Sequence, residues 1–311
     1  MKHFILKISV LSLFFMSILS SCGNGEKITL EYNLKPNETL KQNVVMNTDL
    51  VMKIKDQEMK ISLVMTMKMV FDVKESQGND YTMEVKFKEF KIEAGMPGMG
   101  SISIDSNTDD DIATPENMSP MFKAIIDKPF ETVMDKTGKP KSVKGLEKLI
   151  EAIYNSFDEN VSEAMRQQLM SQFSSQFTEE VFKSQLEQTT GYFPGKPVGT
   201  GDKWTVEMTT KASNFAIGLN LQSTLKSIED NVVTLDIDGT ILTPEGQKEQ
   251  DFNGVKGKVS FKGTLKGSMK LNKDTGWVIS SDMIMNFNGE MDISGIKAPI
   301  YIVSKITVTG E

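Results

Sequence analysis

The sequence predicts a mainly β protein: antiparallel strands in two related, curved β modules, with a small helical insert between them, so α+β overall. Three observations lead to this prediction. Apolar and polar residues alternate with period two over long stretches, similar hairpin turns occur in both halves, and one central segment has helical spacing instead. Period-two alternation is typical of strands with one face buried and the other exposed to solvent.

Three stretches carry the alternation most clearly. In residues 257–271, apolar residues and glycines alternate with Lys, Ser and Thr. Glycines 257, 263 and 267 allow strong curvature or a close approach of backbone or ligand. Residues 59–73 place on one face Met59, Ile61, Leu63, Met65, Met67, Met69, Phe71 and Val73. Residues 277–293 are expected to place on one face Trp277, Ile279, Met283, Met285, Phe287, Met291 and Ile293.

The two halves resemble each other in their turns. A turn at residues 35–40 opens the first set of strands, and a turn at residues 199–204 opens the second. Residues 135–138 (DKTG) and 273–276 (KDTG) each end a hairpin with Gly, which supplies the positive φ that such a reversal needs. We therefore expect two copies of one β module, at residues 22–143 and 191–311.

The segment between the modules, residues 144–190, is expected to form two or three helices. Thr178 is expected to cap the last of them, which would run through Leu186. The run GYFPGKP at residues 191–197 then breaks the helix. Apolar residues recur there at helical spacing: Leu146, Leu149, Ile150, Ile153, Tyr154, Phe157, Val161, Ala164, Met165, Leu169, Phe173 and Phe177.

Residues 1–21 have the features of a secretory signal peptide. Lys2 and Lys7 precede a mostly apolar run that is too short to span a bilayer. The sequence LSSC at residues 19–22 resembles the lipobox of bacterial lipoproteins. That resemblance implies cleavage before Cys22 and attachment of a diacylglycerol to its thiol.

The lipidated chain is expected to be exported and held in a membrane by acyl chains on Cys22. Two or more chains give stable anchoring, whereas one holds only marginally. In enterobacterial lipoproteins an Asp after the lipidated Cys indicates retention in the inner membrane. Here Gly23 follows Cys22, so the resemblance to lipoproteins favours the outer membrane. Glu26 is the only acidic residue nearby, which leaves the periplasmic and the surface face both open.

Composition excludes several kinds of site. The single histidine, His3, lies in the signal peptide, so the mature chain has no His-based catalytic triad or imidazole metal site. Arg166 is the only arginine, which argues against Arg clusters that bind phosphate. The net charge is −7, and an acidic chain lacks the electrostatic footprint of a nucleic-acid-binding protein.

The layout as a whole, with the junction YFPGKPVGTGDKW at residues 192–204, resembles a family of uncharacterised bacterial lipoproteins. No activity is established for that family, so the resemblance implies none. A curved sheet with helices is also similar in architecture to the half-barrel lipid-binding proteins of the lipoprotein-sorting type. Architecture alone does not imply function.

The stretch DIDGT at residues 236–240 resembles the first motif of the haloacid-dehalogenase-like phosphotransferases. The resemblance implies that Asp236 is a nucleophile and Asp238 an acid/base. In that family, however, the motif follows a strand of a parallel α/β sheet, whereas alternating β sequence surrounds it here. We therefore expect both side chains on the solvent-exposed face of a half-buried strand. The sequence predicts no catalytic residues, no cofactor and no enzymatic activity.

Residues 105–116 (DSNTDDDIATPE) have oxygen ligands at the spacing of a calcium loop. Position six is Asp110, where such a loop needs Gly, and the preceding GSISI is strand-like rather than helical. A solvated acidic loop is the favoured interpretation, so no metal site is predicted, although calcium binding at this loop stays open.

The chain contains 21 methionines, many of them on strand faces. Three interpretations fit this pattern: a Cu(I) site built from thioethers, ordinary filling of the core, and a soft concave face suited to a lipid or another apolar ligand. Whether these faces line a cavity or a filled core cannot be derived from periodicity.

Two functional hypotheses follow for this cell-envelope lipoprotein. In the first, the curved sheet holds a lipid or another apolar small molecule, and the inward Met, Phe and Gly positions surround a void. In the second, the protein is a scaffold with a filled core. It then binds an envelope protein through a sheet edge or through the helical insert. This hypothesis predicts an exposed apolar stripe on residues 146–177.

Overall fold

The computed structural model describes residues 27–54, 57–96, 100–212, 215–244, 249–252, 255–293 and 295–311. Almost all of the strands belong to one large, open, antiparallel sheet of 13 strands, which confirms the prediction of a mainly β protein. The predicted signal peptide and Cys22 lie outside the described residues.

The sheet order along the hydrogen-bonded path is β7-β6-β4-β3-β2-β15-β14-β13-β11-β10-β9, with β5 added to β4 and β12 added to β13. In the first half its strands are β2 (Thr39–Ile54), β3 (Gln57–Gln77), β4 (Asp80–Met96), β5 (Gly100–Asp105), β6 (Pro129–Asp135) and β7 (Pro140–Lys144). In the second half they are β9 (Lys203–Ala212), β10 (Phe215–Glu229), β11 (Val232–Leu242), β12 (Gln250–Phe252), β13 (Val255–Asn272), β14 (Val278–Ile293) and β15 (Ile296–Gly310). The C-terminal strand β15 pairs with β2, so both halves of the chain share one continuous sheet.

Two short strands, β1 (Ile28–Thr29) and β8 (Pro197–Val198), pair with each other outside the large sheet. The helices are α1 (Ser119–Lys123), α2 (Leu146–Asn155), α3 (Glu163–Ser174) and α4 (Glu179–Thr190). The last three lie in the predicted helical insert. Thr178 caps α4 as predicted, since its Oγ1 accepts the N–H of Val181 at 3.3 Å, but the helix continues past Leu186 to Thr190.

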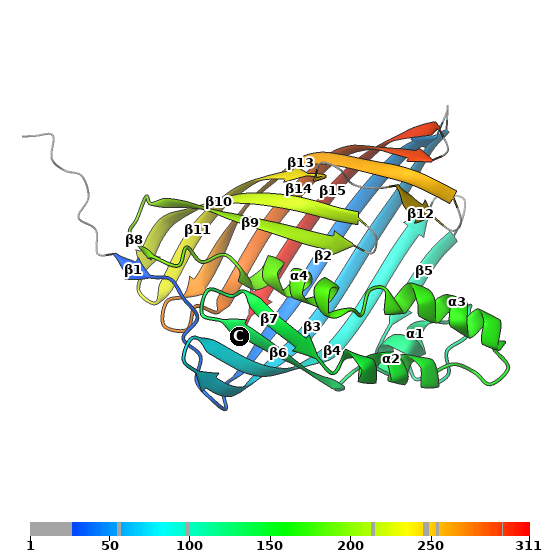
Figure 1. The fold of residues 1–311 in the computed structure, drawn as a ribbon, viewed down its shortest axis with the longest axis horizontal. Helices are drawn as coiled ribbons and strands as arrows, with labels where there is room; N and C mark the ends of the chain where they lie inside the picture. The colour runs from blue at the N-terminus through cyan, green and yellow to red at the C-terminus, as the bar shows by residue number, and fades with distance from the viewer. Residues whose placement is uncertain are drawn as a thin grey trace, which may run out of the picture.

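The sheet curls until its two edge strands, β7 and β9, face each other across α4 (Figure 1). Helix α4 contacts both edges and lies in the gap between them. The strand β15 sits in the middle of the sheet order, on the wall opposite α4. The curled sheet and α4 therefore enclose one interior, and the apolar face of each strand is directed toward it.

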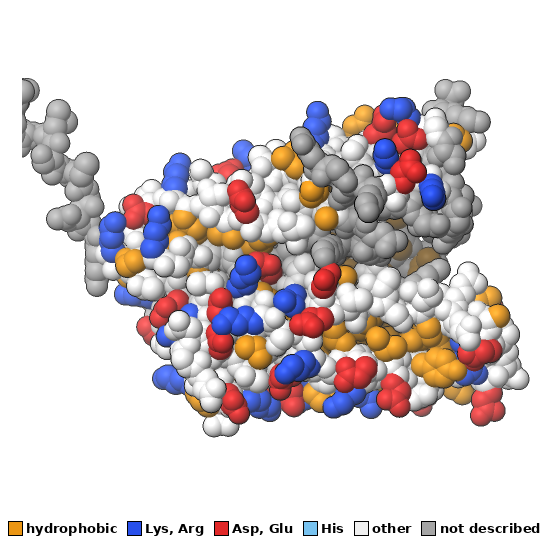
Figure 2. Space-filling view, viewed as in Figure 1, with side chains coloured by type: hydrophobic (Ala, Val, Ile, Leu, Met, Phe, Trp, Pro, Cys, Tyr) orange, Lys and Arg blue, Asp and Glu red, His pale blue; other side chains and the backbone are white. Residues whose placement is uncertain are grey.

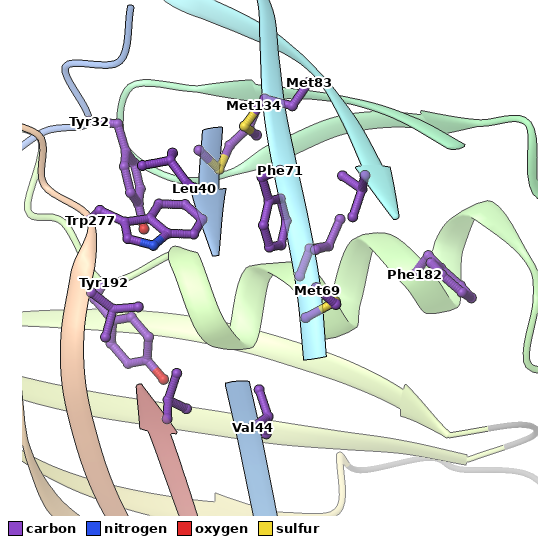
Figure 3. Close-up of a cluster of buried hydrophobic side chains, with 14 of the residues drawn as sticks. Tyr32, Leu40, Val44, Met69, Phe71, Met83, Met134, Phe182, Tyr192 and Trp277 are labelled. Atoms are coloured by element: carbon purple, nitrogen blue, oxygen red, sulfur yellow. The ribbon is translucent and has the colours of Figure 1, made fainter. Parts of the chain in front are cut away.

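One end of this interior is a filled core. Trp277 and Phe71 make an edge-on ring contact at 5.2 Å between centroids, and Tyr32 lies against Trp277 and Phe193. Figure 3 shows Tyr32, Leu40, Phe71 and Trp277 grouped beside β3. Burial raises the pKa of the Tyr32 phenol, whose hydroxyl donates to the Thr190 carbonyl at 3.2 Å. This end of the molecule is thus closed by aromatic packing.

The predicted alternation is confirmed in β3, β11 and β13, and the described side chains of β14 show one exception. The spacing predicts Ile279 on the buried face, but this residue is 36% exposed, whereas its neighbour Val278 is buried. The pairing between β13 and β14 shifts at this point, because Leu271 pairs with Val278 and Lys270 with Ser280. This β-bulge gives β14 one extra residue, which turns Ile279 outward. The side chain of Ile293, also predicted on the buried face, lies outside the described ones.

Both predicted hairpin turns are present, with Gly138 at φ 87° and Gly276 at φ 73°. The proposed duplication of the β module, and the domain boundaries that depend on it, remain predictions.

Figure 2 shows Lys and Asp/Glu side chains interspersed over the surface seen from this side. Among the described residues no charged side chain is buried, so the interior is apolar apart from a few uncharged polar groups.

Candidate ligand-binding cavity

A cavity of about 490 Å³ lies inside the curled sheet, between the filled end and α4. The strands that build it contribute rows of inward residues that run across the sheet. One row, from β4 to β14, is Ile92, Met65, Met46, Ile306 and Met283. Because each of these residues is directly paired with the next across neighbouring strands, their side chains share one face of the sheet, the inner one.

Methionine forms much of the cavity wall on the side of the sheet. Thioether side chains are flexible and polarizable, so this part of the wall can adapt to the shape of a ligand. The methionines that line the cavity are Met46, Met65, Met67, Met69, Met208, Met269, Met283 and Met285.

Phenylalanines form a second wall, from β4 to the helices. Phe87 contacts Phe90 and Phe130, with ring centroids at 4.7 and 5.5 Å, and Phe130 contacts Phe182 of α4 at 5.4 Å. Figure 3 shows Phe182 on α4. Aromatic packing therefore joins the curled sheet to the helix that closes it.

Hydrogen bonds fix α4 at both ends. Near its start, the Val143 N–H of β7 donates to Glu179 Oε1 at 3.4 Å. At its end, Thr190 Oγ1 lies 2.6 Å from the Gly138 carbonyl. Directly after the helix, Trp204 of β9 donates its indole N–H to the carbonyl of Tyr192 at 2.8 Å. The helix is thus tied to both edges of the open sheet.

Among the described residues that line the cavity, none is charged. Its polar lining consists of Gln176, Gln185, Gln188, Thr189 and Tyr192 on the helical side, and Ser281 of β14 on the sheet side. Burial raises the pKa of Tyr192 to about 12, so its phenol is neutral at physiological pH. The described residues therefore provide no formal charge inside the cavity to pair with a charged ligand group.

Gln42 of β2 is a buried polar side chain next to this wall, but it is not among the described residues that line the cavity. It is 2% exposed and lies on the inner face between Met69 and Gly310, one position before the cavity-lining Val44 on that face. Its Oε1 has no hydrogen-bond partner among the described residues. A buried acceptor without a donor costs about 1–3 kcal/mol.

The sequence motif at Asp236 and Asp238 does not contribute to the cavity. Asp236 lies 3.2 Å from the ammonium of Lys226, and Asp238 lies 3.7 Å from that of Lys266, on the outer face of β11. The opposite face of β11 is buried, with Val233, Leu235, Ile237 and Ile241 at 0–1% exposure. The two carboxylates therefore sit on a half-buried strand, as predicted, and not in a pocket.

The acidic loop at residues 105–116 also lies apart from the cavity. Asp111 pairs with Lys123 at 2.8 Å, and Asp110 accepts the side-chain N–H of Asn117. The described part of the chain contains no group of three or more His, Cys, Asp or Glu side chains arranged to hold a metal ion. Nor does any helix within the described ranges have the length and apolar character needed to cross a membrane.

Sequence reasoning missed three features of the site. It did not foresee the placement of α4 between the sheet edges, the aromatic wall that Phe122, Phe130 and Phe173 help to build, or the buried Gln42. Only Gln42 could have been recognised from the sequence. It is a polar residue in a series of apolar residues at alternate positions of β2, namely Leu40, Val44 and Met46.

Comparison with known families places most of the chain's length in one of them. The model of a family described as a family of unknown function, DUF6263, matches residues 78–278. No curated protein sequence matches the chain.

Solved structures give only weak similarity. An outer membrane channel from Pseudomonas putida F1 has 6% identity and a TM-score of 0.28, over 90% of this chain and 97% of that one. The translocator domain of the autotransporter NalP from Neisseria meningitidis has 6% identity and a TM-score of 0.23, over 90% of each chain. OpdQ from Pseudomonas aeruginosa has 8% identity and a TM-score of 0.22, over 89% of this chain and 99% of that one. Similarity at this level supports no conclusion about function.

Proposed function

This chain belongs to the DUF6263 family, and for it we propose a non-enzymatic, lipid-anchored protein of the cell envelope that holds a lipid or another apolar ligand inside its curled sheet. The observation that carries the proposal is the cavity of about 490 Å³ with an uncharged Met- and Phe-rich lining. Its size lies in the range of small-molecule sites, which are mostly apolar with a few polar groups.

The driving force for such a ligand is burial of apolar surface, which contributes roughly 25 cal/mol for each Å² removed from water. An adaptable methionine wall favours chains of variable shape over a single rigid ligand. Helix α4 covers the ligand from the side opposite β15, and the aromatic wall connects β4 and β6 of the sheet to the helices. Together these features support a carrier or a binding protein.

The alternative, a scaffold that binds an envelope protein through its helices, requires an exposed apolar stripe on residues 146–177. In α2 that stripe is packed inward, with Leu149 at 0% and Ile153 at 1% exposure. Tyr154 and Met165 are exposed, at 37% and 39%, but are single side chains of a kind common on soluble surfaces. The buried stripe favours the ligand-binding proposal.

Binding is tested by filling the cavity. Met65→Trp adds bulk on the inner face of β3, whereas Val64→Trp adds it at the neighbouring, outward-facing position, which is 37% exposed. Both are made in a full chain carrying Cys22→Ser, so that no acyl group is attached. In titrations with a neutral apolar fluorophore, Met65→Trp is expected to weaken binding roughly tenfold, equivalent to about 1.4 kcal/mol, and Val64→Trp to leave it unchanged. Equal affinities for the two variants contradict the proposal.

Anchoring at Cys22 is tested separately. The unsubstituted chain is expected to incorporate a labelled fatty acid and to fractionate with the outer membrane, because two or three acyl chains hold a protein stably. Cys22→Ser is expected to lose the label. An unsubstituted chain that fractionates with the membrane without incorporating label would rule out lipid anchoring but leave the cavity proposal intact.

A further inference from the structure

Resting on the proposed function, we propose that the ligand is a long-chain lipid, whose chain fills the cavity and continues along the inner face of the sheet beyond it. We call the part of the inner face that this chain covers the distal apolar face. It consists of Ile61, Leu50, Ile302 and Phe287 in one row across the sheet, and of Met59 and Met52 in the next. The inference names the class of ligand, a chain longer than the cavity, in place of a compact apolar molecule.

The distal apolar face continues the cavity wall. Met46 of β2 and Met65 of β3 line the cavity and pair directly with each other. Four positions farther along the two strands, Leu50 and Ile61 pair in the same way, and the pairing keeps one register along the whole of β2. Side chains four positions apart on a strand point to the same side of the sheet. A chain that leaves the cavity along this wall therefore meets further apolar side chains.

The inner face becomes more accessible along β3 from the filled end outward. Val73 and Phe71 of the filled end are each 1% exposed. Met65 in the cavity wall is partly exposed, and so are Ile61 and Met59 beyond it. Side chains that face a filled core would be buried along the whole strand. Apolar surface on the inner face thus remains accessible from the cavity as far as Met59.

The helices pack against other parts of the sheet. Helix α4 contacts β7 and β9, and α1 contacts β5, while β2, β3 and β15 continue beyond α4 (Figure 1). Among the described residues, Leu50, Ile61 and Ile302 neither belong to the buried core cluster nor pack against it. Contiguous accessible apolar surface of this kind marks a site for a ligand or a partner.

The row between the cavity and the distal apolar face contains two polar residues, Thr48 and Ser304. Their hydroxyls lie 2.8 Å apart and pair with each other. Covering a polar group costs free energy when its hydrogen bond to water is lost without replacement. Because each of these hydroxyls already has a partner in the protein, a hydrocarbon chain can pass over this row.

A hydrocarbon chain suits this surface better than a protein partner does. From Met46 to Met52, β2 extends by roughly 20 Å at about 3.4 Å per residue, so a chain that leaves the cavity gains apolar contact over this length. A polypeptide on the same surface would bring backbone N–H and C=O groups, which the apolar side chains of the distal apolar face leave unpaired. The surface therefore favours a ligand with a long hydrocarbon segment.

Monoacylglycerols of increasing chain length test the inference. The chain from Gly23 onward, exported by a signal peptide without a lipobox so that no acyl group is attached, is loaded with a neutral apolar fluorophore. It is titrated with octanoyl, dodecanoyl and hexadecanoyl glycerol, each below the concentration at which it forms micelles. Affinity is expected to rise roughly twofold for each CH₂ up to hexadecanoyl glycerol, because a half-covered chain gains about half the free energy of full burial.

Two double variants locate the added contact. Leu50→Thr/Ile302→Thr changes two directly paired residues of the distal apolar face, and Val51→Thr/Val303→Thr changes their outward-facing neighbours. Threonine is β-branched and keeps the strand propensity. The first variant is expected to bind hexadecanoyl glycerol roughly tenfold more weakly than the unsubstituted chain and octanoyl glycerol equally well, since only the long chain reaches these residues. The second is expected to change neither affinity. Should the first variant fail to fold, Ile302→Thr alone is expected to show the same selective loss.

The outcomes separate this inference from the proposed function. If octanoyl and hexadecanoyl glycerol bind equally well, the ligand ends inside the cavity and the inference is overturned. Equal losses for short and long chains in Leu50→Thr/Ile302→Thr also overturn it. So does a ligand-free dimer in native mass spectra that this variant dissociates, because the distal apolar face then binds a second copy of the chain. If no monoacylglycerol displaces a fluorophore that Met65→Trp excludes, the proposed function itself fails.

Discussion

Thr190 and Gly138 join the end of α4 to the turn between β6 and β7. The Thr190 hydroxyl lies 2.6 Å from the Gly138 carbonyl, and a Cβ built on Gly138 would lie only 1.9 Å from the Thr190 carbonyl. Gly138 also has φ 87°, which a residue with a Cβ rarely adopts. The closure of the curled sheet by α4 therefore depends on a glycine that the sequence marks only as a hairpin turn.

Gly138→Ala is predicted to destabilise the protein by about 2 kcal/mol or more, because the left-handed backbone penalty is added to a backbone clash. Urea unfolding measures the change. Gly78→Ala is the control, since Gly78 has φ 61° but a Cβ added there would meet no atom within 4 Å. Equal losses for the two variants would show that the contact with Thr190 contributes nothing.

Gly267→Ala is predicted to cost about 1–3 kcal/mol by overpacking β13 against β14. A Cβ there would lie 2.1 Å from the Asp282 carbonyl and 2.6 Å from the Met283 sulfur, so strand separation or sheet curvature must change. Gly95→Ala in β4 meets no atom within 4 Å and is expected to be neutral or slightly stabilising. Thermal unfolding compares the two, and a neutral Gly267→Ala would contradict the close strand approach.

Stability is predicted to fall in acid through the carboxylates on the outer face of β3 and β4. The hydrogen bond from Thr39 lowers the pKa of Asp72, and the hydrogen bond from Lys86 lowers the pKa of Glu84. Because these folded-state pKa values lie below the unfolded ones, the stabilisation is present at neutral pH and is lost as the pH falls through the folded values.

Lys86→Met is predicted to flatten this acid dependence, since Lys86 lies 2.7 Å from Glu84 and 3.4 Å from Asp72. Unfolding free energies measured between about pH 7 and pH 3 test it. Lys144→Met is the control, because its pair with Glu131 is exposed and 4.0 Å long. If the unfolding free energies of Lys86→Met and of the wild type fall equally between pH 7 and pH 3, the contacts of Lys86 with Asp72 and Glu84 are not the cause of the acid dependence.

Asp236→Asn and Asp238→Asn are each predicted to change the unfolding free energy by less than about 0.5 kcal/mol, as expected for exposed ion pairs. Neither is expected to alter binding of the apolar fluorophore, because both carboxylates face away from the cavity. A phosphatase activity that disappears in either variant would refute the interpretation of the DIDGT stretch as an ordinary strand.

The strand faces were predictable because burial on one side imposes period two on each strand separately. Leu235 and Ile237 in β11, and Met65 and Met67 in β3, could be assigned to the inner face from their spacing alone. Ile279 could not be assigned correctly, because a bulge reverses parity and depends on the partner strand rather than on the local sequence.

The cavity itself was not predictable. Periodicity says that Met65 points inward, but not whether a neighbour fills the space in front of it. That depends on how far the sheet curls and on α4, whose bonds to Gly138 and Trp204 connect residues distant in sequence. Such contacts leave no periodic signal, so a filled core and an open cavity share the same sequence pattern.

The most direct test of the central claim is mass spectrometry of the chain from Gly23 onward, exported to a bacterial periplasm by a signal peptide without a lipobox and isolated without added lipid. Native spectra would be compared with an organic extract of the same sample. The expected result is a stoichiometric adduct that is extracted as a lipid or another apolar molecule and is absent from Met65→Trp. A clean ligand-free mass, with no uptake from a lipid mixture, would contradict the claim.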